Sequence, residues 1–275
     1  MMETYFNIRY EFERDEVHRA IETRLNSPGS DYVCVADGVI LDTANRQPEY
    51  LEVVNSGMFA ICDSSFVPLY IKWLYGRQRE QYCGADIFRD IVLSRRYRMI
   101  FLGSQQHVLD ALRANIAKWN PDVETMTFRE LPFLSVEEFD YAAIGRMVEE
   151  DGADIVWVSL GAPKQEYFMH HLKPYLHRGV MIAVGAAFKY FSGLEERRAP
   201  DWMVRAHMEF LFRITQSPRK QLRRCRNILA SLPRLLLDEK RRMMHYTTPS
   251  TCSKANNKKC AHWWTVTGLT PGQKV

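Results

Sequence analysis

Short apolar runs alternate with amphipathic stretches over the first two thirds of the chain. The apolar runs predict buried strands at residues 32–35, 59–62, 99–102, 155–160 and 180–184. Helical periodicity follows over residues 106–119, 136–150 and 165–176. Strands that alternate with helices in this way are typical of a parallel sheet. The pattern therefore predicts an α/β domain with a mostly parallel, Rossmann-like sheet flanked by helices.

The pattern changes near residue 200, where strands stop. Residues 201–215 and 218–237 are predicted as two successive helices, and Pro233 is expected to kink or end the second. The second helix is amphipathic, with an apolar stripe made of Leu222, Cys225, Leu229, Leu232 and Leu236. We therefore expect an α/β domain over residues 1–200, a basic helical appendage over 201–246 and a disordered tail over 247–275.

Charge is distributed unevenly along the chain. The net charge of +4 combines −8 over residues 1–212, +8 over residues 213–242 and +4 over residues 243–275. Such a basic block usually meets a polyanion or an anionic membrane surface. Because the appendage is also amphipathic, we expect it to bind an anionic membrane with its apolar stripe in the headgroup boundary. The alternative is that the stripe packs against the α/β domain. The basic residues expected to contact the membrane or a lipid-linked acceptor are Arg219, Lys220, Arg223 and Arg224.

The sequence also bears on the compartment. No apolar run approaches the roughly 18 residues that span a bilayer, and residues 1–14 lack the apolar core of a signal peptide. The six cysteines include no CxxC pair, and we expect them to be reduced and mostly structural. The protein is therefore expected in the cytoplasm.

Polar residues follow several of the predicted strands. Ligands of open parallel sheets bind beyond the carboxyl ends of the strands, so Asp37, Asp63 and Gly103 are candidates. The fourth candidate is the segment 161–166, where a strand ends at Gly161 and a helix begins near Pro163. Backbone N–H groups at such a helix start suit a phosphate.

Each of these candidates also has a purely structural interpretation. Asp63 is suited to act as a general base, but it equally fits the cap of the next helix, and Asp37 fits a turn or cap. Lys164 opposes the preference of a helix start for negative charge, which favours a bound anion. The alternative is an ordinary exposed first turn. All of these interpretations stay open from the residues alone.

Several enzyme classes lack their signatures in this chain. The sequence contains no GxGxxG, P-loop, GxSxG or HExxH motif. It also lacks the D-x-D motif with which many sugar-nucleotide transferases hold a divalent metal. His170 and His171 are adjacent and cannot share one helix face, so we do not expect them to bind a metal together.

Six segments between residues 84 and 220 carry a resemblance to one enzyme family. They are Gly84-Ala85-Asp86, Phe101-Leu102-Gly103, Gly161-Ala162-Pro163-Lys164-Gln165-Glu166, Val184-Gly185-Ala186-Ala187-Phe188, Arg198-Ala199-Pro200-Asp201-Trp202 and Ser217-Pro218-Arg219-Lys220. Together they resemble the WecG/TagA/CpsF glycosyltransferases, also called glycosyltransferase family 26. The resemblance covers roughly residues 33–225, which is most of the chain.

The resemblance implies a hexosyltransferase of cell-envelope polysaccharide synthesis. It implies inverting transfer, without a metal or other cofactor, of a hexose from a UDP donor to an acceptor sugar linked to undecaprenyl or another lipid diphosphate. The hexose is most typically N-acetylmannosamine. By the family pattern Asp63 matches the base and Gln165 a pocket residue. The basic C-terminal helix matches an appendage that touches the inner face of the cell membrane and closes over the site.

The substrate-binding residues expected on these grounds include three departures from the family pattern. The expected set is Asp37, Gln81, Gly103, Gly161, Pro163, Lys164, Gln165, Glu166, Gly185 and Lys189. Val35 and Asp37 stand where the family has Thr-x-Asn, Gln81 stands in place of Arg, and Lys189 in place of Asp. These exchanges alter the charge and hydrogen-bond donors of the pocket. Another donor hexose, such as glucose, is therefore an alternative, and loss of activity is a further one.

A different class of function competes with the transferase. The α/β domain could be a scaffold, with the Arg-rich helix binding phosphates or nucleic acid without catalysis. A basic nucleic-acid-binding helix needs no UDP pocket, whereas the transferase needs a pocket and a membrane surface. We favour the transferase, and we expect no nucleic-acid partner.

Overall fold

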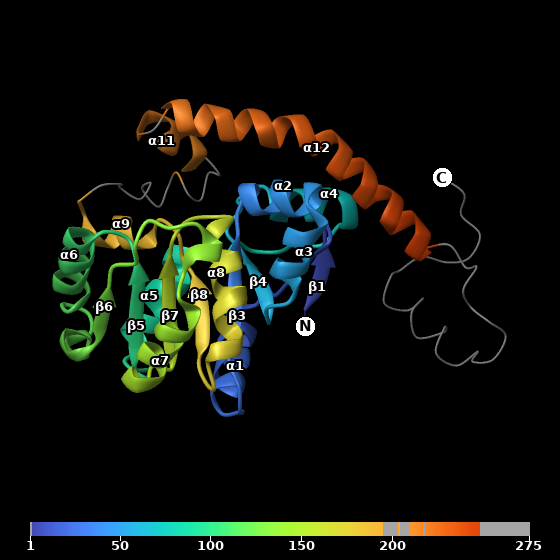
Figure 1. The fold of residues 1–275 in the computed structure, drawn as a ribbon. Helices are drawn as coiled ribbons and strands as arrows, with labels where there is room; N and C mark the ends of the chain where they lie inside the picture. The colour runs from blue at the N-terminus through green and yellow to red at the C-terminus, as the bar shows by residue number, and fades with distance from the viewer. Residues whose placement is uncertain (1, 195–202, 204–208, 217, 248–275) are drawn as a thin grey trace, which may run out of the picture. The chain divides into compact units, whose positions relative to one another are not determined.

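The computed structural model describes residues 2–194, 203, 209–216 and 218–247 (Figure 1). Its eight-stranded sheet has the order β1-β2-β4-β3-β8-β7-β5-β6, and every neighbouring pair is parallel except β1 and β2. The strands are β1 (Glu3–Tyr5), β2 (Ile8–Tyr10), β3 (Asp31–Ala36), β4 (Phe59–Cys62), β5 (Met99–Gly103), β6 (Thr127–Arg129), β7 (Ile155–Ser159) and β8 (Val180–Ala183). The predicted α/β class with a mostly parallel sheet is confirmed.

Helices connect the strands and continue beyond the last one. The α-helices are α1 (Arg14–Leu25), α2 (Gly38–Arg46), α3 (Pro48–Asn55), α4 (Val67–Tyr75), α5 (Gly84–Ser94), α6 (Gln106–Ile116), α7 (Tyr141–Asp151), α8 (Lys164–Leu172), α9 (Ala187–Ser192), α11 (Glu209–Gln216) and α12 (Pro218–Thr247). Three short 3-10 helices are η1 (Pro121–Thr125), η2 (Val136–Glu138) and η3 (Lys173–Tyr175). Residues 1–235 form one compact unit and residues 236–275 a second.

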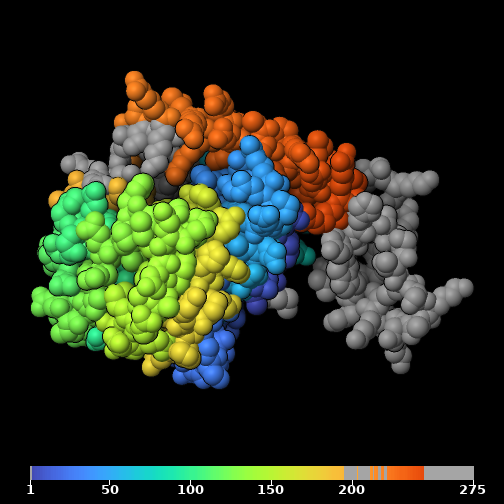
Figure 2. All heavy atoms as spheres, in the orientation of Figure 1, coloured from blue at the N-terminus to red at the C-terminus, as the bar shows by residue number. Residues whose placement is uncertain are grey.

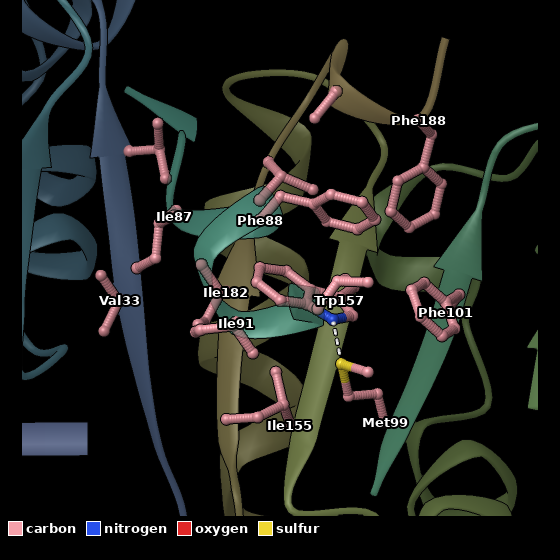
Figure 3. Packing of buried hydrophobic residues seen from close by; sticks show 14 of the residues in the cluster. Val33, Ile87, Phe88, Ile91, Met99, Phe101, Ile155, Trp157, Ile182 and Phe188 are labelled. Carbon is pink, nitrogen blue, oxygen red and sulfur yellow. Dashed lines mark hydrogen bonds between the residues drawn. The ribbon is translucent and has the colours of Figure 1, made fainter. Parts of the chain in front are cut away.

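One face of the sheet carries the main hydrophobic core. Strand pairing aligns Phe101 with Trp157, Trp157 with Ile182, Ile182 with Val33, and Val33 with Phe59. All five side chains belong to one buried cluster, which Figure 3 shows in part. Because side chains alternate along a strand, this row places the same face of five strands in the core.

Aromatic residues join the helices to that face. Phe88 of α5 lies with its ring centroid 4.8 Å from that of Trp157 and 5.9 Å from that of Phe188 in α9 (Figure 3). Helices α1 and α6 contribute further apolar residues to the same cluster. Packing of this kind holds the carboxyl ends of β5, β7 and β8 in a fixed arrangement.

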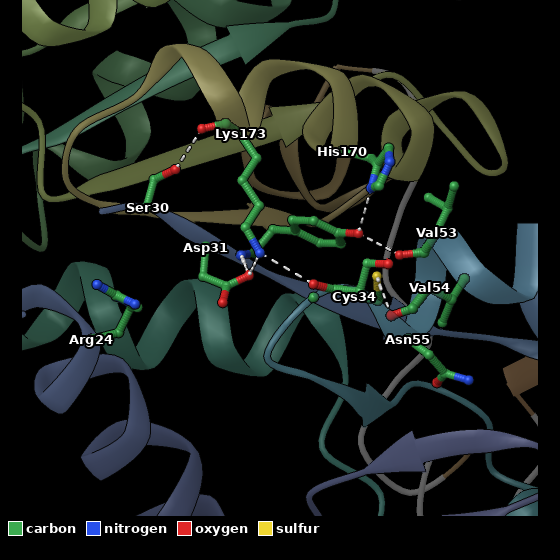
Figure 4. Close-up of polar contacts among 12 residues, drawn as sticks. Arg24, Ser30, Asp31, Cys34, Val53, Val54, Asn55, His170 and Lys173 are labelled. Carbon is green, nitrogen blue, oxygen red and sulfur yellow. Dashed lines mark hydrogen bonds and ion pairs between the residues drawn. The ribbon is translucent and has the colours of Figure 1, made fainter. Parts of the chain in front are cut away.

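The opposite face is covered by helices that include α3, α7 and α8. Helix α8 packs against both α3 and α7, and Figure 2 shows its yellow atoms between the blue and green segments. At its far end, Lys173 Nζ lies 2.8 Å from Asp31 Oδ1, and the Ser30 hydroxyl donates to the Lys173 carbonyl at 3.0 Å (Figure 4). These contacts tie the C-terminal end of α8 to the start of β3.

The appendage differs from its prediction in one respect. Helix α12 continues through Pro233 to Thr247, so Pro233 does not end it, and the other expected outcome, a kink, stays a prediction. Residues 201, 202 and 204–208 of the preceding predicted helix, and 248–275 of the predicted tail, lie outside the described residues. Among the helices that the structure describes, none has the length and apolar character needed to cross a membrane. The three-part division of the chain stays a prediction.

Candidate active site

A polar cavity of about 280 Å³ lies at the carboxyl ends of the parallel strands. It is lined by residues that follow β3, β4, β5, β7 and β8, among them Asp37, Asp63, Ser104, Gln165 and Gly185. This is the edge at which open parallel sheets bind ligands. The structure therefore brings together four strand-end regions singled out in the sequence.

A second cavity of about 330 Å³ shares Asp37, Asp63 and Arg224 with the polar cavity. Its walls are largely apolar. On one side they include Val39, Leu41, Phe66 and Tyr70, and on the other Cys225, Ile228, Leu229, Leu232 and Leu235 of α12. All of these residues belong to the compact unit that ends at Leu235. We call the two sites the polar cavity and the apolar cavity.

Asp63 stands where the two cavities meet. Its backbone N–H donates to the Ala36 carbonyl at 3.0 Å, which continues the pairing of β3 and β4. Its carboxylate accepts a hydrogen bond from the Gly84 N–H, the first residue of α5, at 3.0 Å. Helix α4, the next helix along the chain, begins at Val67 without a side-chain cap. Asp63 thus caps α5 instead, with its carboxylate at the edge of both cavities.

Asp37 caps α2, as its structural interpretation predicted. Its Oδ1 accepts hydrogen bonds from the N–H groups of Val39 and Ile40, both at 2.9 Å. The residue also lines both cavities. Its contact with a substrate stays a prediction.

Gly103 owes its identity to a close approach of two strands. Its φ is +100°, and a Cβ placed there would lie 2.5 Å from the Ser159 carbonyl oxygen. Gly103 itself is absent from the cavity lining of the described chain, but the next residue, Ser104, belongs to it. Ser159 also lines the cavity, and its hydroxyl donates to the Gly185 carbonyl at 2.7 Å.

The segment after β7 folds back on itself. The Gly161 N–H donates to Gln165 Oε1 at 3.1 Å, so this N–H, expected to face a phosphate, already has a partner. Gln165 is 4% exposed and Glu166 is fully buried. Gln165 and Gly161 line the polar cavity, whereas Glu166 lies behind them. The interpretation as an exposed first helical turn is therefore wrong for these two side chains.

Lys164 extends away from this cavity. Its Nζ donates to the Leu134 carbonyl and lies 5.3 Å and 5.1 Å from the ring centroids of Phe133 and Phe139. Neither Lys164 nor Pro163 is among the residues that line the polar or the apolar cavity of the described chain. A substrate-binding role for these two residues stays a prediction.

The departures from the family pattern occupy different positions. Lys189 lines the polar cavity, whereas Gln81 lies outside both linings, with its Nε2 donating to the Asp63 carbonyl at 2.9 Å. Arg224 reaches both cavities from α12. Arg219 and Arg223 are exposed on the same helix, and the side chain of Lys220 lies outside the described residues. The side chains at this site therefore include two cations beside two carboxylates.

The buried Glu166 has the most perturbed carboxyl group near the site. Burial raises its pKa to about 7, while hydrogen bonds from Gln165 and Tyr50 act in the opposite direction. The Tyr50 hydroxyl donates to Glu166 Oε2 at 2.9 Å, and burial raises the pKa of Tyr50 as well. Within the described part of the chain, no group of three His, Cys, Asp or Glu side chains could hold a metal ion.

Some residues of this region had no signal in the sequence. Tyr50 lies inside α3 and Tyr190 inside α9, with no motif around either. Tyr190 lines the polar cavity and Ile228 the apolar one. Only the tertiary fold brings such residues to the site, although the apolar stripe of α12 left packing against the α/β domain open as the alternative to membrane binding.

Comparison with known proteins identifies the family of this chain. A protein of Bacillus subtilis (strain 168), named N-acetylglucosaminyldiphosphoundecaprenol N-acetyl-beta-D-mannosaminyltransferase, is 24% identical over 262 residues, which is 90% of this chain and 96% of the relative. A protein of the same name from Bacillus spizizenii (strain W23) is 24% identical over 71% of this chain and 75% of its own length. The sequence model of the glycosyl transferase WecG/TagA/CpsF family matches residues 5–245. The chain thus belongs to the WecG/TagA/CpsF family and is a glycosyltransferase.

Proposed function

We propose that the protein transfers an N-acetylmannosamine-type hexose from a UDP donor to a sugar carried on a lipid diphosphate. The observation that carries this proposal is the position of Asp63, which lines both the polar and the apolar cavity. A transferase must bring donor and acceptor together at one base. Two adjoining cavities of unlike character, joined at a carboxylate, meet this requirement.

The polar cavity suits the UDP donor. Its lining combines backbone turns at Gly161 and Gly185 with the cationic side chains of Lys189 and Arg224. As the bond to the sugar breaks, negative charge develops on the UDP diphosphate, and a cation such as Lys189 can stabilise it. The nucleotide therefore occupies this cavity in our proposal, with its diphosphate toward Lys189, and Arg224 at the junction is left for the acceptor.

The apolar cavity suits the lipid end of the acceptor. It runs beside α12 from Arg224 to Leu235, about 16 Å along a helix at 1.5 Å per residue. Walls formed by Ile228, Leu232 and Leu235 favour an isoprenoid or other hydrocarbon chain. Arg224, at the junction of the cavities, is placed to meet the acceptor diphosphate, which leaves the acceptor sugar next to Asp63.

The chemistry that follows is a single displacement. The Asp63 carboxylate takes the proton of the acceptor hydroxyl, whose oxygen attacks the anomeric carbon of the donor sugar. The bond from that carbon to the UDP oxygen breaks, and the configuration inverts. The hydrogen bond from Gly84 fixes the carboxylate in place for this step. No residue of the chain is covalently modified in the reaction.

The donor sugar depends on three positions that differ from the family pattern. Asp37 and Lys189 line the polar cavity, and Gln81 contacts the backbone of Asp63. The carboxylate of Asp37 and the ammonium of Lys189 alter the hydrogen bonds offered to the sugar hydroxyls and acetamido group. N-acetylmannosamine, named for the two Bacillus relatives, is our first choice, and glucose is the alternative.

The basic face of α12 supports binding at the inner surface of a membrane. Arg219, Arg223 and Arg226 are exposed, and Leu222 and Leu229 are 57% and 65% exposed. Basic residues with neighbouring apolar ones are suited to an anionic lipid surface. A peripheral position there would deliver the lipid-linked acceptor to the apolar cavity.

An assay of the purified protein with a panel of UDP-sugars and lipid-diphosphate-linked acceptors tests the proposal. We expect release of UDP and a glycosylated lipid with one donor, N-acetylmannosamine before glucose. A matched thermal-shift experiment with UDP and with a nucleic acid distinguishes the transferase from the nucleic-acid-binding alternative. A ligand that binds the folded protein raises its melting temperature. Stabilisation by nucleic acid alone, with no turnover of any donor, would overturn the proposal.

A further inference from the structure

A carboxylate without an ion-pair partner lies directly behind the wall of the polar cavity. Glu166 is fully buried and forms no ion pair within the described residues. Glu166 interacts electrostatically with four titratable groups, which are Tyr50 of α3, Cys34 and Tyr32 of β3, and Asp37 at the start of α2. None of these is a cation. A buried carboxylate in such surroundings destabilises the fold when it is ionised, unless hydrogen bonds satisfy it.

Those hydrogen bonds form a chain that ends in the cavity. The Tyr50 hydroxyl donates to one carboxylate oxygen at 2.9 Å, and Gln165 Nε2 donates to the other at 2.9 Å. Gln165 Oε1 in turn accepts from the Gly161 N–H at 3.1 Å. An ionised carboxylate can only accept, so it determines which end of the Gln165 amide faces it. The orientation of the amide and the Gly161 turn are therefore set by Glu166.

We propose that Glu166 is a positioning residue that fixes the Gln165 amide and the Gly161 backbone in the wall of the polar cavity. The proposal rests on the proposed function, because it takes this cavity to be the UDP site. Gln165 has a second N–H and a second oxygen lone pair besides those it uses in the chain of bonds. Since Gln165 lines the cavity, these groups face a ligand only while the amide keeps this orientation.

Protonation of Glu166 disturbs the arrangement. A protonated carboxyl has one hydrogen-bond donor and one good acceptor, yet both of its neighbours in the chain are donors. Either Tyr50 or the Gln165 amide must then turn, and a buried group loses its partner. A glutamine at position 166 likewise offers one oxygen that accepts, with an NH2 group in place of the carboxyl O–H, so Glu166→Gln mimics the neutral, protonated state at every pH.

The protonation change falls in the neutral range. Burial raises the pKa of Glu166 to about 7, which places most of its titration between about pH 6 and about pH 8. Binding of UDP is therefore expected to strengthen as the pH rises through this range. UDP itself also titrates, but equally with the parent and with Glu166→Gln. A comparison of the two proteins therefore gives the part of the pH dependence that comes from Glu166.

The first measurement is calorimetric binding of UDP at about pH 5.5 and about pH 8, on either side of this titration. The parent is expected to bind about tenfold more tightly at the higher pH, in line with the loss of one buried hydrogen bond. Glu166→Gln is expected to bind UDP at both pH values with the weaker affinity that the parent shows at about pH 5.5. Glu150→Gln, the same exchange at an exposed position of α7, is the matched control and should follow the parent.

The second measurement needs no ligand. The side-chain amide signals of Gln165, assigned by their loss in Gln165→Glu, are followed by NMR across the same pH range in the parent and in Glu166→Gln. We expect them to shift with an apparent pKa near that of Glu166 in the parent and to stay constant in the variant. If UDP binds to no form of the protein, this titration still decides the positioning role while the proposed function fails. Equal UDP affinity in parent and variant at both pH values, or an amide that does not titrate in the parent, would overturn the positioning role.

Discussion

The polar cavity and the apolar cavity adjoin at Asp63 but are built in different ways. Strand ends, backbone turns and a buried hydrogen-bond chain form the polar one, so its shape is set by the sheet. The apolar one requires α12 as a wall, and Ile228 comes so near α2 that a Cβ on Gly38 would lie 2.8 Å from it. In our proposal the α/β domain forms most of the nucleotide site, whose lining includes only Arg224 from α12, whereas acceptance of a lipid depends on the wall that α12 adds.

The largest effect is expected where the cavities meet. Asp63→Asn should lower turnover by roughly 10² to 10⁴, the usual contribution of a general base, and leave UDP affinity within a few-fold. The amide oxygen can still accept from Gly84, so the cap of α5 is kept. Turnover is measured by UDP release, with Asp110→Asn at an exposed position of α6 as the control. A variant that retained more than about a tenth of the parent rate would reduce Asp63 to a cap.

The next effect concerns the binding of α12 to the membrane, from which the lipid-linked acceptor enters the apolar cavity in our proposal. Replacement of Arg219, Arg223 and Arg226 with Gln should weaken binding to anionic vesicles by about a hundredfold, because each basic residue near the surface contributes about 1 kcal/mol. Co-sedimentation at low and high salt measures it, and the parent should itself bind less at high salt. Neutral vesicles are the control. If the parent never sediments with anionic vesicles, the membrane role of α12 is wrong.

A smaller effect is expected from the wall of the apolar cavity alone. Leu232→Ser should raise the KM for the lipid-linked acceptor about tenfold, since part of a leucine side chain no longer contacts the hydrocarbon. The KM for the UDP-sugar should not change. Leu93→Ser, at a 48% exposed position of α5, controls for loss of a leucine as such. An equal rise for both substrates would show that the two cavities do not act separately.

The last effect is on stability and concerns the polar cavity. The pKa of Glu166 is raised in the folded protein, so its contribution to the free energy of unfolding is present below about pH 4.5 and is lost as the pH rises through about 7. The loss is about 3 kcal/mol at most, equivalent to several degrees of melting temperature. Glu166→Gln should lack this decline. Scanning calorimetry from about pH 5 to about pH 8 compares the melting temperatures of the parent and the variant. If the melting temperatures of parent and variant changed with pH in the same way, the raised pKa of Glu166 would be contradicted.

The sequence predicted the parts of the molecule that depend on local pattern. The five apolar runs all became strands of the sheet, and Asp63 and Gly161 lie at strand ends as expected. Strands β1, β2 and β6 are three residues each, too short to show a period. They form because neighbouring strands offer partners, which a local pattern does not contain.

The parts of the site that were missed depend on tertiary contacts. Lys164 and Glu166 were both placed in the pocket by their motif, yet one extends toward Phe139 and the other is buried against Tyr50. A helix start shows which residues lie in its first turn but not which neighbour each one meets. For the same reason the stripe of α12 does not reveal what each leucine meets, since Leu232 lines the apolar cavity whereas Leu222 is exposed and its membrane contact stays a prediction.

The central claim is that donor and acceptor occupy separate cavities that meet at Asp63. Its most direct test is equilibrium binding of UDP and of the lipid-linked acceptor, each to two variants. Lys189→Met, in the polar cavity, should weaken UDP about tenfold and leave the acceptor unchanged, and Leu232→Ser should do the reverse. If either variant weakened both ligands equally, or if the two effects were exchanged, the assignment of the cavities would be wrong.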